Sequence, residues 1–373
     1  MGEAGALPSL SLVSSHTGPE YGAYAPTGGS TKCHAPLNTD ACHLALHGVR
    51  QAAVIDQQVC NGRGRNMKTI RDALNHIGAP VRGGWEMALI WASLALLVHN
   101  EANIQTTILL IAIAVGYGLA FVINDYYDAP FDAEDEFKAQ RNFFVHNEIP
   151  QGKALLILIG ISSFLFLAFA QFGIKGLVIL AVCFFVMWGY SAEPLRFKSR
   201  PGFELLIHAL SIETFPYLIC LFLVDAAWTR LDYVMLSVAF FASLTTQLEQ
   251  QVRDFEVDSK TDTNFTARFG LETTSIFLKV ATSVLVFVLL VNVINGTIPL
   301  SLLPLGFIAF PSVAHRFIRG REEPRSEKLA AVLLKAGLLY IGVVFVYVLL
   351  TGQQLPNFIA TLPSVVCLIY DQS

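Results

Sequence analysis

Charge is what this sequence has least of. Asp, Glu, Lys and Arg make up 14% of its 373 residues, and hydrophobic residues make up 54%. A soluble domain carries about 25% charge, so the deficit argues against two or three soluble domains and favours one membrane domain. The net charge is −4. The sequence therefore lacks the basic excess of a nucleic-acid-binding protein, and we expect no nucleic-acid partner.

Closely spaced cysteines are also missing. The six cysteines form no CxxC pair, and Cys183 and Cys220 lie in apolar runs, where a thiol behaves as a small hydrophobe. The two Cys-His pairs that begin at Cys33 and Cys42 have no helical or hairpin pattern around them to fix a ligand geometry. We therefore predict no zinc site there.

The first 66 residues lack hydrophobic periodicity and contain no apolar core of the kind found in signal peptides. Their Gly, Ser, Thr, Pro and His content predicts a disordered extension, and the alternative is that translation starts at Met67. Residues 67–84 have the pattern of a surface helix leading into a membrane domain at 85–351. Residues 352–373 are left as a C-terminal tail.

Long apolar runs dominate the rest of the chain. A membrane-spanning helix needs about 20 apolar residues, and each run must be helical because lipid cannot satisfy an open backbone. We predict an all-α integral membrane protein with about nine helices in a bundle around a central cavity, capped by cytoplasmic loops. The predicted spans are 85–99, 104–123, 154–173, 175–190, 203–224, 231–248, 274–294, 298–314 and 329–351.

Basic residues are unevenly divided between the loops. They gather after the second, fourth, sixth and eighth spans, whereas the other loops hold little more than Lys175 and Arg230. The positive-inside rule therefore places the even-numbered loops and the N-terminus in the cytoplasm. We expect a multi-pass protein in contact with membrane lipids, in the plasma membrane if the chain is prokaryotic.

Acidic side chains follow the second span, in residues 124–132, which read NDYYDAPFD. Asp125, Asp128 and Asp132 share one face if the helix continues through them. Carboxylates this close repel one another unless a cation lies between them, and such oxygen ligands suit Mg²⁺ held together with substrate phosphates. We predict Asp128 and Asp132 as metal ligands and Asp125 as a substrate contact. The alternative is a solvated acidic loop.

A second polar face follows the sixth span, where Gln247, Gln251, Asp254 and Asp258 are spaced by four, three and four residues. We predict Asp254 and Asp258 as metal ligands and Gln251 as a substrate contact. Two facing acidic clusters can hold Mg²⁺ ions that neutralise a diphosphate as its C–O bond breaks. Apolar walls would then shield the allylic cation from water.

Cations follow the fourth span in residues 190–201, which read YSAEPLRFKSRP. Arg196 and Lys198 are suitable partners for phosphate oxygens, and Lys138 and Arg141 in the loop after the second span are further candidates. The alternative for all of them is an ordinary anchor at the cytoplasmic face.

Glu213 lies near the middle of the fifth span, where a carboxylate is costly and faces the bundle interior. Two interpretations remain open. Glu213 contacts the acceptor or takes a proton lost on alkylation, or it makes a packing hydrogen bond to Ser or Thr.

These motifs together resemble a known family. The NDxxDxxxD segment resembles the first signature of the UbiA-type intramembrane prenyltransferases, and Asp254-xxx-Asp258, followed by Thr266 and Gly270, is similar to the second. The YSAEPLRFK segment is similar to the loop of the branches that prenylate chlorins and carotenoids. The resemblance covers roughly residues 80 to 351.

The resemblance implies a nine-helix fold, Mg²⁺-dependent ionisation of a prenyl diphosphate, and attack by a lipophilic acceptor such as a carotenoid, a quinone precursor, a chlorin or another lipid. By matching positions, it implies that the Mg²⁺-diphosphate is bound by Asn124, Asp128, Asp132, Asp254 and Asp258. Tyr190 and Lys198 are implied to line the pocket.

Two other functions use part of the same pattern. A membrane terpene cyclase would ionise the same diphosphate with the same acidic clusters. A proton-coupled transporter would carry its charged groups near the midplane in several spans, whereas the acids of this chain gather at one membrane face.

Overall fold

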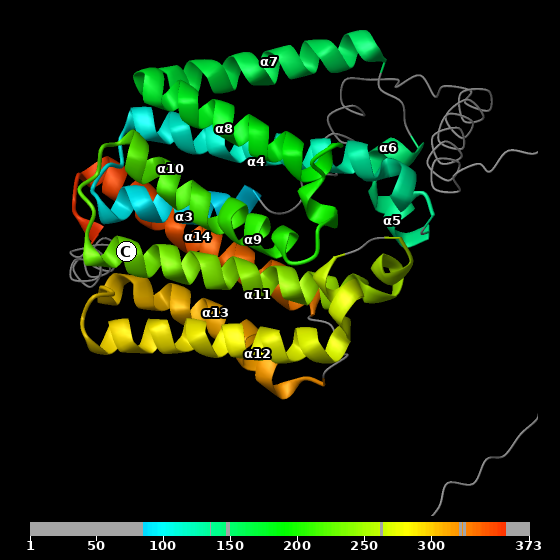
Figure 1. The fold of residues 1–373 in the computed structure, drawn as a ribbon. Coiled ribbons are helices and arrows are strands. Elements are labelled where there is room, and N and C mark those ends of the chain that lie inside the picture. The colour runs from blue at the N-terminus through cyan, green and yellow to red at the C-terminus, as the bar shows by residue number, and fades with distance from the viewer. Residues whose placement is uncertain are drawn as a thin grey trace, which may run out of the picture. The chain divides into compact units, whose positions relative to one another are not determined.

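The computed structural model describes residues 85–134, 136–146, 150–261, 264–320, 323 and 326–355, and every regular element in these ranges is helical (Figure 1). The predicted extension at 1–66, the entry segment at 67–84 and most of the C-terminal tail lie outside the described residues. The prediction of an all-α membrane protein is confirmed.

Eight helical segments in the described part of the chain are long and apolar enough to cross a membrane. Their outward side chains include Leu156 and Phe287, which are 71% and 67% exposed, as expected where lipid replaces water. Two of the segments combine shorter pieces. The elements are α4 (Ile104–Asp132), α7 (Gln151–Ala170), α8 (Gly173–Ser191), α9 (Phe203–Ala209) continuing through a π-helical turn (Leu210–Thr214) into α10 (Phe215–Leu223), α11 (Arg230–Thr261), α12 (Phe265–Ile294), a 3₁₀ turn (Leu300–Leu302) leading into α13 (Leu303–Ile318), and α14 (Glu327–Thr351).

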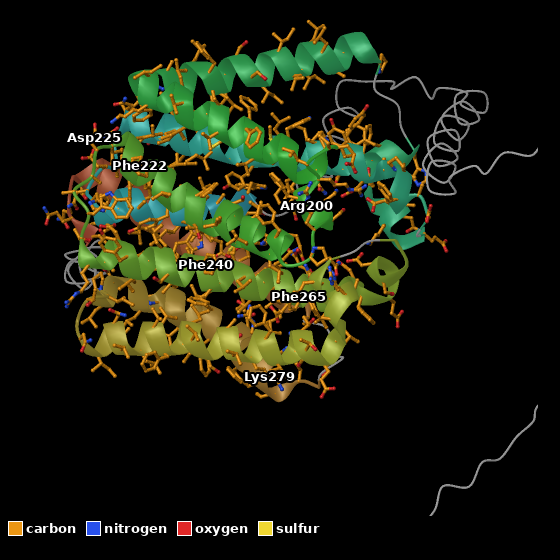
Figure 2. The ribbon with its side chains drawn as sticks, in the orientation of Figure 1. Arg200, Phe222, Asp225, Phe240, Phe265 and Lys279 are labelled. Carbon is orange, nitrogen blue, oxygen red and sulfur yellow. The ribbon has the colours of Figure 1, made fainter. Side chains whose placement is uncertain are left out.

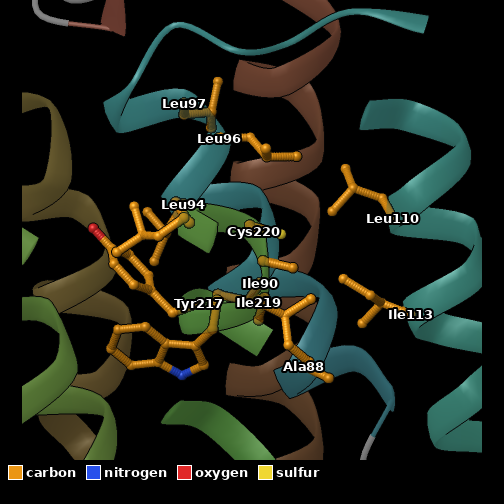
Figure 3. Close-up of a cluster of buried hydrophobic side chains, with 14 of the residues drawn as sticks. Ala88, Ile90, Leu94, Leu96, Leu97, Leu110, Ile113, Tyr217, Ile219 and Cys220 are labelled. Atoms are coloured by element: carbon orange, nitrogen blue, oxygen red, sulfur yellow. The ribbon is translucent and has the colours of Figure 1, made fainter. Parts of the chain in front are cut away.

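The first predicted span is the 14-residue helix α3 (Trp85–Val98). At 1.5 Å per residue it reaches about 21 Å, which is shorter than the roughly 30 Å hydrocarbon layer. Its side chains from Ile90 to Leu97 are all buried, and α3 packs against α4, α10 and α14 (Figure 3). A helix that is apolar on every side belongs in the interior of a bundle. The predicted count of nine spans stays a prediction.

Two long helices carry the acidic clusters. α4 begins at a capping box between Asn103 and Thr106 and continues through Pro130 to Asp132, so the three aspartates of the first cluster share one helix. α11 contains 32 residues and ends at Thr261, well beyond the predicted end of the sixth span at 248. The second cluster therefore lies on the last turns of a continuous helix.

The loops after the even-numbered spans meet at one end of the bundle. Lys138 in the short helix α5 (Glu136–Arg141) bonds Asp258 on α11, and Lys198 in the 3₁₀ turn Phe197–Ser199 bonds Asp128 on α4. Figure 2 shows Phe222 and Asp225 at the opposite end. This arrangement agrees with the expectation that the loops after the even-numbered spans lie on the same side of the membrane. Their cytoplasmic location stays a prediction.

Candidate active site

A cavity of about 390 Å³ lies among α4, α7, α8, α9, α10 and α11. Its wall changes character along its length. One part carries the acidic clusters and lysines that the loops bring together, and the rest is apolar and aromatic, with Leu165, Phe169, Phe184 and Ile219 on its wall. The cavity therefore joins a charged end to an apolar body.

Asp128 anchors the first cluster. The Lys198 amine donates to one Asp128 oxygen, and the Asn124 amide donates to the other at 2.9 Å. Asn124 Oδ1 accepts in turn from Lys198 at 3.1 Å and from the Ser191 hydroxyl at 3.0 Å. Asn124, Asp128 and Lys198 all line the cavity, as does Tyr190. The structure thus brings together four of the predicted site residues from three elements.

Asp125 and Asp132 lie outside the cavity wall. The amide of Asn142, which is buried, donates to Asp132 Oδ2 at 2.8 Å and to the Asp125 backbone oxygen at 2.7 Å. This contact holds the loop after α4 against the helix. Asp132 lies one helical turn beyond Asp128 on α4. Asp125 lies on the same helix, near the charges of Asp128, Asp132 and Lys198.

The second cluster is also paired with cations. The Lys138 amine donates to Asp258 Oδ1 at 2.8 Å, and the Asn264 amide donates to Asp258 Oδ2 at 2.8 Å. Burial lowers the pKa of Lys138, but the hydrogen bond and the charge of Asp258 outweigh it and hold the pKa above its usual value. Lys138, Asp254 and Asp258 all line the cavity.

Asp254 is bound by its sequence neighbour. The Arg253 guanidinium donates to both carboxylate oxygens, at 2.7 and 2.6 Å, and also reaches Glu327 on α14 at 2.8 Å. Bidentate pairs of this kind are among the strongest charge-assisted hydrogen bonds. Arg253 is one of the basic residues that follow the sixth predicted span, and the structure shows it fixing an acid of the second cluster.

Two other predicted residues have different surroundings from those expected. The Arg196 guanidinium stacks over the Phe131 ring at 4.1 Å and does not line the cavity. Gln251 lines the cavity, but its amide is bonded to Glu204 and to Thr266. The Arg141 side chain lies outside the described part of the structure.

Glu213 is 1% exposed and does not line the cavity, although Ser211 and Ile212 do. It lies in the π-helical turn and accepts a hydrogen bond from the Trp91 indole, near the charge of Arg316. This contact is a packing hydrogen bond, as in the second of the two open interpretations, but its donor is an indole and not Ser or Thr.

Arg316 belongs to a buried ion network. It bonds Glu249 at 3.0 Å, Arg319 bonds the other Glu249 oxygen at 2.8 Å, and Arg316 also donates to Thr245 at 2.8 Å. This network ties α13 to α11, and it places Glu213 among packed charges rather than beside the cavity.

The structure also shows polar cavity residues that the sequence reasoning did not identify. They are Glu204, His208, Gln250 and Asn264. Gln250 neighbours Gln251 on the same helix, but the spacing rule selects only one face. Asn264 is the N-cap of α12, a local pattern that could have identified it. Glu204 has no such pattern, because its side-chain partners Gln251 and Phe265 lie on other helices.

The donor set of the cavity fits a hard divalent cation. Carboxylates of Asp128, Asp254 and Asp258 and the amides of Asn124, Gln247 and Gln250 all supply oxygen. In the described part of the chain, no three His, Cys, Asp or Glu side chains come close enough to hold a metal ion by themselves. An ion bound here would need further oxygen ligands, and substrate phosphates commonly supply them to Mg²⁺.

Comparison with solved structures supports the fold. A UbiA homolog from Archaeoglobus fulgidus bound to GPP and Mg²⁺ is 20% identical, with a TM-score of 0.59 over 73% of this chain and 98% of that chain. The same homolog bound to Cd²⁺ is 20% identical, with a TM-score of 0.57 over 73% of this chain and 97% of that chain. The apo structure of a UbiA homolog from Aeropyrum pernix K1 is 13% identical, with a TM-score of 0.53 over 70% of this chain and 97% of that chain.

No curated protein sequence matches the chain. The model of the UbiA prenyltransferase family, in contrast, matches residues 87–335, which contain all the cavity-lining residues. With its apolar helices and a cavity that is charged at one end, the chain belongs to the UbiA prenyltransferase family and is a multi-pass membrane prenyltransferase.

Proposed function

We propose that the protein transfers a prenyl group from a prenyl diphosphate to a lipophilic acceptor and releases diphosphate, using Mg²⁺. One observation carries the proposal. Carboxylates on two separate helices, each already paired with a cation, line one end of a cavity that is otherwise apolar. That arrangement suits a substrate with an anionic head and a hydrocarbon tail.

In this proposal Asp128, Asp254 and Asp258 hold the divalent cation, with Asp132 one turn beyond. When bound, the ion neutralises the diphosphate as the C–O bond to the prenyl carbon breaks. Lys198 and Lys138 contact diphosphate oxygens, since both amines already lie beside the acids that share this end of the cavity. Asn124 and Tyr190 orient the same group.

The apolar body of the cavity has two roles. It holds the prenyl chain, and it excludes water from the allylic cation, which would otherwise be hydrolysed. The attacking atom of the acceptor then forms the new bond to the prenyl carbon as diphosphate leaves. A carbon nucleophile afterwards loses a proton, and a carboxylate nucleophile has none to lose. The YSAEPLRFK segment favours a large lipophilic acceptor, either a chlorin or a carotenoid, and the basic loops favour a cytoplasmic charged end.

The test uses the full chain purified in detergent. Prenyl diphosphates of several lengths are supplied with Mg²⁺, with and without candidate acceptors, and released diphosphate and product mass are measured. We expect acceptor-dependent products heavier by one prenyl unit, loss of turnover with EDTA, and recovery with added Mg²⁺. A cyclic product with the carbon count of the donor would show cyclisation in place of transfer, and absence of diphosphate release with every donor would refute the proposal.

A further inference from the structure

The start of α12 is held by side chains from three different elements. The first N–H groups of a helix have no partner within the helix. In this protein Phe265 N donates to Glu204 Oε1 at 2.6 Å, Thr266 N donates to Gln251 Oε1 at 3.1 Å, and Ala267 N donates to Asn264 Oδ1 at 2.8 Å. The N-terminus of α12 is therefore closed by protein acceptors and does not offer these donors to an anion.

These acceptors are also bonded to one another. Gln251 Nε2 donates to Glu204 Oε1 at 3.2 Å, and the Thr266 hydroxyl donates to Gln251 Oε1 at 3.0 Å. Glu204, Gln251 and Thr266 are 1%, 3% and 0% exposed. A buried polar network whose members are bonded in this way is rigid, because each broken bond would leave a desolvated polar group.

The network touches the second acidic cluster in two places. Gln251 precedes Asp254 by three residues and Asp258 by seven, so it lies on the same helical face. Asn264, whose Oδ1 caps α12, uses its amide to donate to Asp258 Oδ2 at 2.8 Å. Glu204 is the second residue of α9, six residues after Lys198. The network thus connects the acids on α11 to the segment that carries the lysine of the first cluster.

We propose that Glu204 is a positioning residue that fixes the rotation of the last turns of α11, and hence the placement of Asp254 and Asp258 for the divalent cation. The inference rests on the proposed function, because it assigns those aspartates to the Mg²⁺-diphosphate. Glu204 acts through its Oε1, which accepts from two different helices, and its negative charge is not required for this role.

A carboxylate and an amide both offer an acceptor oxygen, but only the carboxylate is charged. This difference provides the test. Glu204→Gln keeps an Oε1 that accepts from Phe265 N and Gln251 Nε2, whereas Glu204→Ala removes it. Loss of a partner behind a metal ligand costs about 10- to 100-fold in metal affinity or activity. We expect Glu204→Ala to raise the half-saturating Mg²⁺ concentration for diphosphate release about 10-fold or more, and Glu204→Gln to stay near wild type.

A binding measurement separates this inference from the proposed function. The rise in melting temperature produced by Mg²⁺ with geranyl diphosphate should be kept in Glu204→Gln and reduced in Glu204→Ala. Equal losses in both variants would overturn the inference by showing that the charge matters. An unchanged Mg²⁺ dependence in Glu204→Ala would overturn it by showing no positioning effect. Failure of the wild-type protein to release diphosphate would instead refute the proposed function.

Exchanging Glu204 and Gln251 keeps the test decisive if Glu204→Ala fails to fold. Gln251→Glu sets two carboxylates against each other and should lose activity, and the double variant Glu204→Gln with Gln251→Glu restores a donor–acceptor pair and should recover it. Such coupling between neighbours is what a double-mutant cycle measures. Thr282→Val, which removes a buried hydroxyl bond elsewhere on α12, is the control and should leave the Mg²⁺ dependence unchanged. Failure of the double variant to exceed Gln251→Glu would overturn the inference.

Discussion

The two ends of α11 hold aspartates in opposite ways. Near its start, Asp232 is 0% exposed and accepts hydrogen bonds from Tyr217 at 2.8 Å and from the Thr229 backbone N–H at 2.6 Å, and His99 lies 2.8 Å away. Near its end, Asp258 lines the cavity and pairs with the amine of Lys138, which comes from a short loop helix.

The difference shows how one residue type serves two purposes on one helix. The partners of Asp232 are Tyr217 on α10 and His99 and Thr229 in the segments beside α3 and α11. They enclose Asp232 completely, so its bonds are part of the fold and leave no room for a ligand. The lysines beside Asp128 and Asp258 sit on connecting segments and carry a charge that a metal ion can replace. A fully buried acid whose oxygens are bonded within the fold indicates a role in stability. A cavity acid paired with a lysine from a loop indicates a role in binding.

The largest effect expected is the loss of turnover on removing a cavity carboxylate. Asp258→Ala should lower diphosphate release by about 10²- to 10³-fold, the usual cost of removing one group that stabilises developing charge. The melting temperature in detergent should remain near that of wild type. Asp225→Ala, at the far end in an exposed pair with Lys175, is the matched control. Near-normal turnover in Asp258→Ala would remove the second cluster from the mechanism.

The converse effect is expected at the other end of the helix. Asp232→Ala leaves buried donors on Tyr217 and Thr229 without an acceptor, at about 1–3 kcal/mol for each unsatisfied group. We expect a clear fall in the melting temperature, with turnover per folded molecule unchanged. A variant that stays stable but loses turnover would break the comparison, because Asp232 would then act in the reaction.

Removal of a cavity lysine should have an intermediate effect. Lys198→Ala should raise the KM for the prenyl diphosphate about 10- to 100-fold, because a hydrogen bond to a charged group contributes about 1.5–3 kcal/mol. Lys198→Arg keeps the charge but changes the shape of the donor, and it should recover part of the affinity. An unchanged KM in Lys198→Ala would mean that the lysine only neutralises Asp128.

The smallest effect is expected at Glu213. Glu213→Gln keeps the size of the side chain and an acceptor for the Trp91 indole, and Glu213 does not line the cavity. We therefore expect unchanged diphosphate release and an unchanged product, with at most a modest loss of stability. Product identity is checked by mass. An altered product would restore the predicted contact between Glu213 and the acceptor.

Local spacing accounts for most of what could be predicted. The aspartates at 125, 128 and 132 and the polar face from Gln247 to Asp258 follow from the periodicity of a helix, and the structure places both clusters on continuous helices. Helix ends were less predictable. The seventh span was expected to begin at 274, but α12 begins at Phe265 and bends at Gly270, whose φ is 82°, a backbone conformation open mainly to glycine.

The sequence did not predict which side chains bond to one another. Gln251 was predicted to contact substrate, and in the structure its amide is bonded to Glu204 and Thr266. Glu213 was correctly placed in the bundle interior, but nothing near it in the sequence indicates Trp91. Partners separated by many residues are decided by helix packing, which periodicity alone does not encode.

The sequence by itself determined that the protein is a helical membrane protein with acids and cations at one face, because apolar length, charge distribution and helical spacing are local properties. Tertiary structure alone decided which acids line the cavity, which are locked into the fold, and that Glu204, Gln251 and Asn264 join three helices behind the second cluster. The reason is physical. A buried polar group must find a partner wherever packing brings one, and packing joins residues that lie far apart in the chain.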